Sequence, residues 1–318
     1  RHAAAIVAGV VGNKPLPSEI LERITERADG IPLFVEELTK ALLEGGGLRE
    51  QDGGYVLDGP LHSSAIPSSL HASLMARLDR LKPVKEVAQI GAAIGRSFSY
   101  AFLAAVARRT DTQLREALDR LAAAGIVTLR GAPPNATITF KHGLMQDAAY
   151  GTLLRVPRQQ FHARIAEVLV EQFPETAGTQ PEIVAHHYTQ AGLVEPAIDF
   201  LRRAGERALR RSSNVEGVRH LTCALELLAS RPEGHERDRL ELRLRLALGP
   251  AMRALKGNGA DEVWVVFSRA RELVEDSASV KERMIILHGL WSVQNMRGGQ
   301  LAAHVLDTPK AMQNDHPF

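Results

Sequence analysis

The sequence has one cysteine, few aromatic residues and no phosphate-binding loop. Among its 318 residues there is a single Cys, and aromatic residues make up 5%. One thiol cannot close an internal disulfide, which excludes a disulfide-stapled fold and fits a reducing compartment. The Gly-x-x-x-x-Gly-Lys-Ser/Thr pattern of a P-loop occurs nowhere in the chain. This chain alone therefore lacks the loop with which P-loop ATPases hold phosphates.

Long hydrophobic runs and catalytic motifs are also missing. The apolar run at residues 3–12 is short, contains two Gly and is followed by no small-x-small cleavage site. No run reaches the ~18 apolar residues of a membrane span. Gly-x-Ser-x-Gly, His-Glu-x-x-His and Cys-x-x-Cys are absent. We expect a cytoplasmic protein with no membrane partner and no catalytic residues in this chain; whether its parent is an enzyme is left open.

What is present favours helices. Ala, Leu, Arg and Glu dominate, and straight-chain residues of this kind lose little rotamer freedom in a helix. The hydrophobic fraction of 45% is that of a globular protein, and the formal charge of +2 demands no nucleic-acid partner. The sequence predicts a mainly α fold in several blocks.

Residues 1–64 are predicted to form a helical block. Ser18 follows Pro17 as a candidate N-cap, and apolar residues then recur at helical spacing until Gly30. Pro32 opens a second helix, in which Glu36 and Glu37 are expected on the solvated face. Residues 55–57 suggest a short strand.

Residues 65–156 show the order of helices and strands that is typical of a winged helix. Helices are expected at 84–94, 100–107 and 111–124, with Asp111 as a cap, then strands at 126–129 and 138–140 and a last helix at 143–154. The helix at 111–124 holds three acidic and two basic residues, so its charge has the wrong sign for DNA, and we expect no nucleic-acid partner.

Residues 157–302 are predicted to be TPR-like helical repeats. The pattern at 185–198 resembles the first half of a helix pair, and a related cadence returns at 217–228. Residues 240–248 alternate as in a strand, but their intervening Glu, Arg and Ala favour a helix. Residues 303–318 lose the pattern and are interpreted as an irregular, truncated tail.

Two features of the predicted repeats could carry a metal site or a reactive thiol, and we interpret both as structural. His186 and His187 are adjacent, face different sides of a helix and have no ligand residue at i+4, so no metal site is predicted. Cys223 lies in an apolar helical setting and is interpreted as a small packing residue.

Several stretches together resemble the C-terminal part of bacterial STAND/AAA-type ATPases. They are residues 29–40 (DGIPLFVEELTK), preceded by 14–17 and followed by 73–81, 87–95 and 140–154. The order is most similar to the adenylate/guanylate cyclase-like ATPases with TPR-like repeats; LuxR-type regulators share the ATPase and the repeats but end in a DNA-binding helix-turn-helix. The resemblance implies an ATPase helical lid, a winged-helix domain and repeats. It covers residues 1–210 well and becomes weaker up to 300.

The resemblance carries over to three residues. Gly30 and Pro32 match the Gly-x-Pro turn of the lid, which lies against bound adenine; the alternative is a plain Gly C-cap before Pro at the first helical position. His142 matches the His of a Met-His-Asp triplet that reaches the β-phosphate of ADP. Here the triplet is Lys141-His142-Gly143, so the Asp is absent and a purely structural His is the alternative.

By this resemblance the chain is a regulatory or sensor fragment of a nucleotide-gated signalling ATPase. Its implied partners are a P-loop ATPase core missing from a chain that starts at Arg1, and a protein or small ligand on the repeats. ATP or ADP is expected in the intact parent only, and no cofactor for this chain alone. The alternatives are a stand-alone TPR-like adaptor that binds proteins, or a fragment of a LuxR-type regulator.

Overall fold

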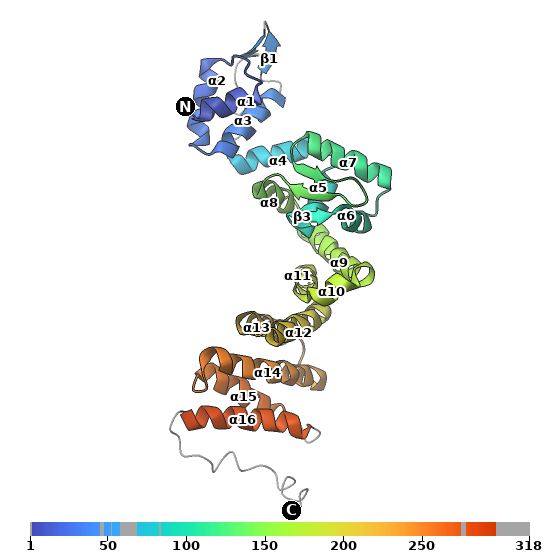
Figure 1. Ribbon diagram of the computed structural model, residues 1–318, viewed down its shortest axis with the longest axis vertical. Helices are drawn as coiled ribbons and strands as arrows, with labels where there is room; N and C mark the ends of the chain where they lie inside the picture. The colour runs from blue at the N-terminus through green and yellow to red at the C-terminus, as the bar shows by residue number, and fades with distance from the viewer. Residues whose placement is uncertain are drawn as a thin grey trace, which may run out of the picture. The chain divides into compact units, whose positions relative to one another are not determined.

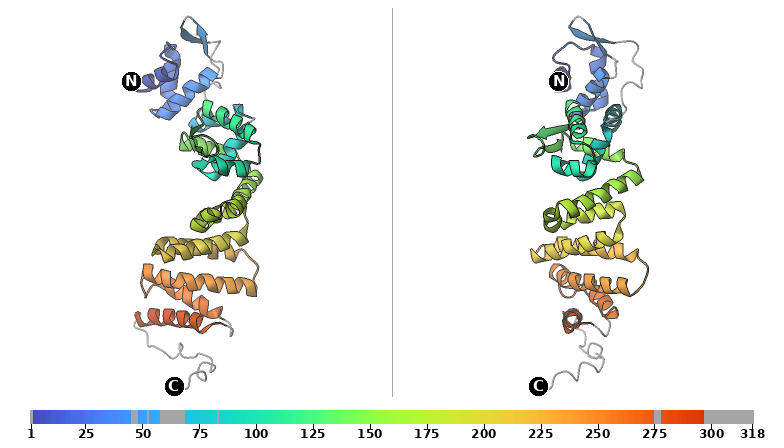
Figure 2. Two further views of the ribbon diagram at one scale, coloured as in Figure 1. Left: turned by 45° about the vertical axis from the view of Figure 1, so that its right-hand side comes forward. Right: turned by 90° about the vertical axis from the view of Figure 1, so that its right-hand side faces the viewer.

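The computed structural model describes residues 2–44, 48–51, 53–57, 69–82, 84–274 and 278–296. Within them the fold is mainly α, as predicted, with 16 helices and two small antiparallel sheets. The chain divides into two compact units, residues 1–161 and 162–318. Figures 1 and 2 show the elements of each unit along the chain.

Three helices and a hairpin form the first part of unit one: α1 (His2–Val10), α2 (Ser18–Ala28), α3 (Pro32–Glu44), β1 (Leu48–Gln51) and β2 (Gly54–Leu57). Ile20, Ile24 and Leu38 are fully buried where α2 packs on α3. The strand expected at 55–57 is present, and its partner β1 was not predicted. Ser18 is the first helical residue, not the N-cap; Pro17 holds that position and no side chain caps the helix.

The winged-helix topology is complete between residues 85 and 151. Its elements are α5 (Lys85–Ile94), β3 (Ser97–Ser99), α6 (Tyr100–Ala107), α7 (Asp111–Ala123), β4 (Val127–Arg130), β5 (Thr137–Phe140) and α8 (Gly143–Gly151). The strand order is β3-β5-β4, with both pairs antiparallel. Helix α4 (Leu70–Arg80) precedes this module and is capped by Ser69, whose hydroxyl accepts a hydrogen bond from the Ala72 amide.

Two local predictions in this module are corrected. The cap of α7 is Thr110, not Asp111, because Thr110 and Gln113 form a reciprocal capping box. Asp111 instead accepts a hydrogen bond from the Tyr100 hydroxyl at 2.5 Å. The strand β3, three residues long, was not predicted; Phe98 on it lies opposite Ile138 of β5.

The remaining described residues, up to 296, form a series of helices: α9 (Arg155–Gln172), α10 (Pro174–Thr179), α11 (Pro181–Ala191), α12 (Val194–Arg210), α13 (Asn214–Ala229), α14 (His235–Lys256), α15 (Asp261–Glu272) and α16 (Val280–Met296). From α11 on, each packs against the next, as Figure 2 shows. The helix predicted over residues 240–248 is confirmed, and no strand occurs among the described residues of unit two. Close approach of α12 and α13 depends on glycine, since a Cβ on Gly205 would lie 2.7 Å from Cγ of Leu221.

Two of the three expected domain boundaries, at 64/65 and 302/303, lie outside the described residues, as does the tail 303–318. The third, at 156/157, falls in the first turn of α9. Across the described ranges, no helix combines the length and the apolar character needed to cross a membrane.

Candidate functional site

The turn between α2 and α3 presents backbone and apolar surface to solvent. Asp29 and Gly30 are both left-handed, with φ of 44° and 74°, and the Ile31 amide donates a hydrogen bond to the Ala28 carbonyl at 2.9 Å. Pro32 begins α3, where its missing N–H costs no helical hydrogen bond. Ile31 between them is 48% exposed. An exposed, rigid apolar turn of this kind suits contact with a flat ring, which is the role that the resemblance implies for Gly30 and Pro32.

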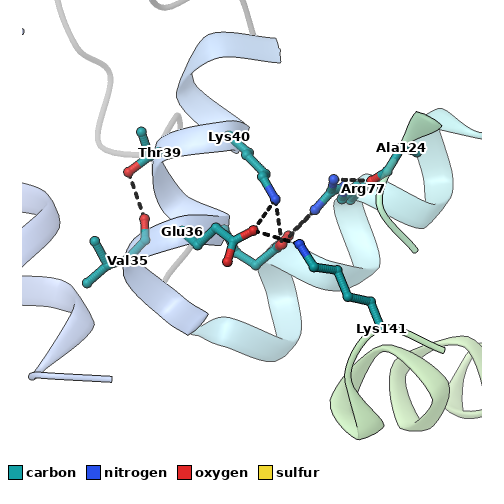
Figure 3. A network of polar contacts seen from close by, with 8 residues as sticks. Val35, Glu36, Thr39, Lys40, Arg77, Ala124 and Lys141 are labelled. Atoms are coloured by element: carbon teal, nitrogen blue, oxygen red, sulfur yellow. Dashed lines mark hydrogen bonds and ion pairs between the residues drawn. The ribbon is translucent and has the colours of Figure 1, made fainter. Parts of the chain in front are cut away.

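A buried ion pair holds α3 against α4. One guanidinium nitrogen of Arg77, Nη1, lies 2.6 Å and 2.7 Å from the two carboxylate oxygens of Glu37. Arg77 Nη2 donates a further hydrogen bond to the carbonyl of Ala124, at the end of α7 (Figure 3). Glu37 is 1% exposed, so its predicted place on the solvated face is wrong. One guanidinium thus joins α3, α4 and the winged helix.

Glu36, the neighbour of Glu37, makes a second link to the winged helix. Its Oε1 accepts hydrogen bonds from Lys40, one turn later, and from Lys141 Nζ at 3.3 Å (Figure 3). Burial alone would raise the pKa of Glu36, but the two ammonium groups outweigh it and lower the pKa below its usual value. Lys141 immediately precedes His142. The structure therefore brings α3, the helix that begins at Pro32, into contact with the segment that contains His142, the third residue predicted to contact nucleotide.

His142 occupies the N-cap position of α8 in an extended conformation, with φ of −133° and ψ of 145°. Its side chain makes no capping hydrogen bond, and its Nε2 is buried without a hydrogen-bond partner. Arg96 lies nearby: its Nη1 is 3.9 Å from where a Cβ on Gly143 would stand. The first amides of a helix have no intrahelical acceptors and favour an anion. An unpaired imidazole nitrogen, a guanidinium and a helix N-terminus are together suited to a phosphate.

Sequence reasoning missed the role of Arg77, although its position was informative. Arg77 is three residues after Leu74 and one before Leu78, both of which are buried. A charged residue inside an apolar helical stripe needs a partner, since an unpaired buried charge is costly. That position predicts a buried partner; it does not tell which carboxylate provides it.

No protein-family model matches the chain. Over 264 residues the chain is 29% identical to an uncharacterized protein of Rhizobium meliloti (strain 1021), and the match covers 81% of this chain and 24% of that protein. The chain thus spans about a quarter of the length of this relative.

Proposed function

We propose that this chain is the regulatory part of a nucleotide-gated signalling ATPase of the STAND type, most like the adenylate/guanylate cyclase-like ATPases, working in the cytoplasm. The observation that carries the proposal is the buried, unpaired Nε2 of His142 at the start of α8. It lies one residue from Lys141, which contacts the helix of the Gly30-x-Pro32 turn through Glu36. Both predicted nucleotide-contacting segments therefore belong to one connected structure.

In the proposed mechanism, a P-loop domain of the longer parent binds ADP or ATP. The Gly30–Pro32 turn covers the adenine, and His142 donates a hydrogen bond to the β-phosphate, with the N-terminus of α8 favouring the negative charge. Nucleotide then ties the lid to the winged helix and holds the closed state. A protein or small ligand on the helices of unit two shifts that equilibrium in proportion to its differential affinity for the two states. The output domain lies outside this chain.

Two further facts agree with the proposal. The relative is about four times as long as its matched region, as expected of a module inside a larger polypeptide. The helix α7, which would enter a DNA groove in a DNA-binding winged helix, carries Asp111, Glu116 and Asp119 against two arginines. This charge disfavours DNA phosphates, and the proposed role of the winged helix requires no DNA binding.

The test is ADP retention by the protein encoded by the complete reading frame, which the proposal requires to contain an in-frame P-loop upstream of Arg1. His142→Ala should release bound ADP about tenfold faster or more, the value of one charge-assisted hydrogen bond. His2→Ala is the matched control, because His2 is an exposed residue at the start of a helix in the same unit. Equal ADP retention and equal output in both variants, or a reading frame without a P-loop, would replace the proposal with a nucleotide-independent adaptor.

A further inference from the structure

Three histidines from two helices meet within unit two. His162 lies on α9, and His186 and His187 lie on α11. Nδ1 of His162 is 2.8 Å from Nδ1 of His187, and one potential ligand nitrogen from each of the three rings lies within 4.8 Å of the other two. The ring centroids are 5.1 to 5.8 Å apart. From the sequence, His186 and His187 were not expected to bind a metal, because they are neighbours on one helix and have no ligand residue at i+4. In the structure His162, from another helix, provides a third imidazole beside them.

The spacing is close to that of an imidazole-bound transition metal. With Zn–N bonds of about 2.0–2.1 Å, tetrahedral ligand nitrogens stand about 3.4 Å apart. Nδ1 of His162 and Nδ1 of His187 are closer than this, at 2.8 Å, and the three potential ligand nitrogens all lie within 4.8 Å of one another, so binding of an ion requires the rings to rotate until the nitrogens are evenly spaced. No carboxylate belongs to the cluster within the described residues, which disfavours Ca²⁺ and Mg²⁺ and favours ions that prefer imidazole.

The three histidine side chains differ in solvent exposure. His162 is 1% and His187 is 3% exposed, whereas His186 is exposed. Two ligands are thus fixed in the interior and the third lies at the surface. A site of three histidines with one side toward solvent keeps a fourth coordination position for water or another small ligand, as catalytic zinc sites do.

We propose that His162, His186 and His187 form a binding site for a divalent transition-metal ion of the Zn²⁺ type, with one open coordination position on the His186 side. The ion joins α9 to α11 at the beginning of the helical stack. This inference is independent of the proposed nucleotide function, because every ligand lies in unit two, whereas His142 lies in unit one.

The test is Zn²⁺ binding to the 318-residue chain, purified without a polyhistidine tag and stripped of metal with a chelator. Titration calorimetry should show one ion per chain, and Co²⁺ in its place should give the absorption of a four-coordinate site. His186→Ala should weaken binding at least tenfold, and His187→Gln should abolish it. The control His220→Ala, on α13 of the same unit, should leave affinity unchanged.

The alternative is a structural hydrogen bond between His162 and His187 with no metal. It predicts no saturable one-to-one binding, and that result overturns the proposal. Unchanged affinity in His186→Ala also overturns it, and this variant decides the case even if His187→Gln fails to fold, because the His186 ring lies at the surface. A thermal shift produced by Zn²⁺ in the native chain and lost in His186→Ala is the second expected result.

Discussion

Arg77 of α4 and Glu37 of α3 form an ion pair that is almost entirely withdrawn from solvent, across 40 residues of sequence. The Arg77 side chain is 6% exposed and that of Glu37 1%. Both carboxylate oxygens face the same guanidinium nitrogen, at 2.6 and 2.7 Å. In such a pair each charge offsets the desolvation of the other, so the two residues are expected to depend on each other strongly.

Replacing Arg77 with Met should destabilise unit one by about 3 kcal/mol, because it leaves the buried Glu37 carboxylate with only Lys40, 4.0 Å away, as a counter-charge. The double variant Arg77→Met/Glu37→Leu should recover most of this loss, since no buried charge then remains. Hydrogen exchange of the α3 and α4 amides is the suitable measurement. It reports on unit one, whereas both Trp residues, Trp264 and Trp291, lie in unit two.

A surface ion pair in the same unit provides the control. Asp79 and Lys85 are bonded at 2.6 Å, but the Asp79 side chain is 56% exposed. Asp79→Ala should cost less than about 1 kcal/mol. If Arg77→Met were as mild as Asp79→Ala, the pair would not be what holds α3 against α4.

The winged helix was predictable because its information is local. The apolar period changes from helical to alternating after Gly125, and this change marks β4 and β5 at nearly the observed residues. The third strand, β3, was missed because three residues carry no usable period. Its identity comes from pairing with β5, about 40 residues later.

The candidate sites depended on contacts between distant segments, which local periodicity does not encode. Glu37 was assigned to the solvated face from its neighbours in α3, while its partner lies on α4. His186 and His187 were excluded as ligands from their own helix, while His162 comes from α9. In both cases the sequence identifies the polar residue but not its partner, because tertiary packing and not sequence spacing brings the two together.

Gly30 and Gly12 form a matched pair that separates a conformational from a functional role. Both have positive φ, 74° and 66°, and a Cβ on either would meet no atom within 4 Å. Substitution by Ala should therefore cost each position a similar ~1–2 kcal/mol of backbone strain. In the complete parent protein, only Gly30→Ala should also accelerate ADP release, because only Gly30 lies in the turn proposed to cover adenine. Equal ADP release in the two variants would leave Gly30 with a conformational role alone.

Glu241 of α14 is the buried acid at the centre of an ion-pair cluster in unit two. Its Oε1 accepts hydrogen bonds from Arg245 at 2.8 Å and from Arg269 of α15 at 3.2 Å. Burial acts to raise the pKa of Glu241, but the hydrogen bonds from Arg269 and Arg245 outweigh it, and the pKa lies below its usual value. A carboxyl group with a depressed pKa in the folded state stabilises that state at pH values above its unfolded pKa, about 4.3, and loses this contribution as the pH falls further.

Glu241→Gln should therefore lower the stability of unit two at pH 7, and the gap between variant and native chain should close as the pH falls below the unfolded pKa and through the depressed folded-state pKa of Glu241. Once the native Glu241 is protonated as well, it no longer differs in charge from Gln. Urea unfolding followed by Trp fluorescence measures this difference in stability. Trp264 packs against the apolar cluster that contains Leu242 and Phe267, and Trp291 lies on α16, which contributes Leu290 to the same cluster. The control is Glu272→Gln: this carboxylate also bonds to Arg269, at 3.0 Å, but its side chain is 60% exposed. Solvent screening should make its effect small at every pH. A gap for Glu241→Gln that stayed constant from pH 7 to pH 3 would show that the hydrogen-bonding shape of residue 241 matters and its charge does not.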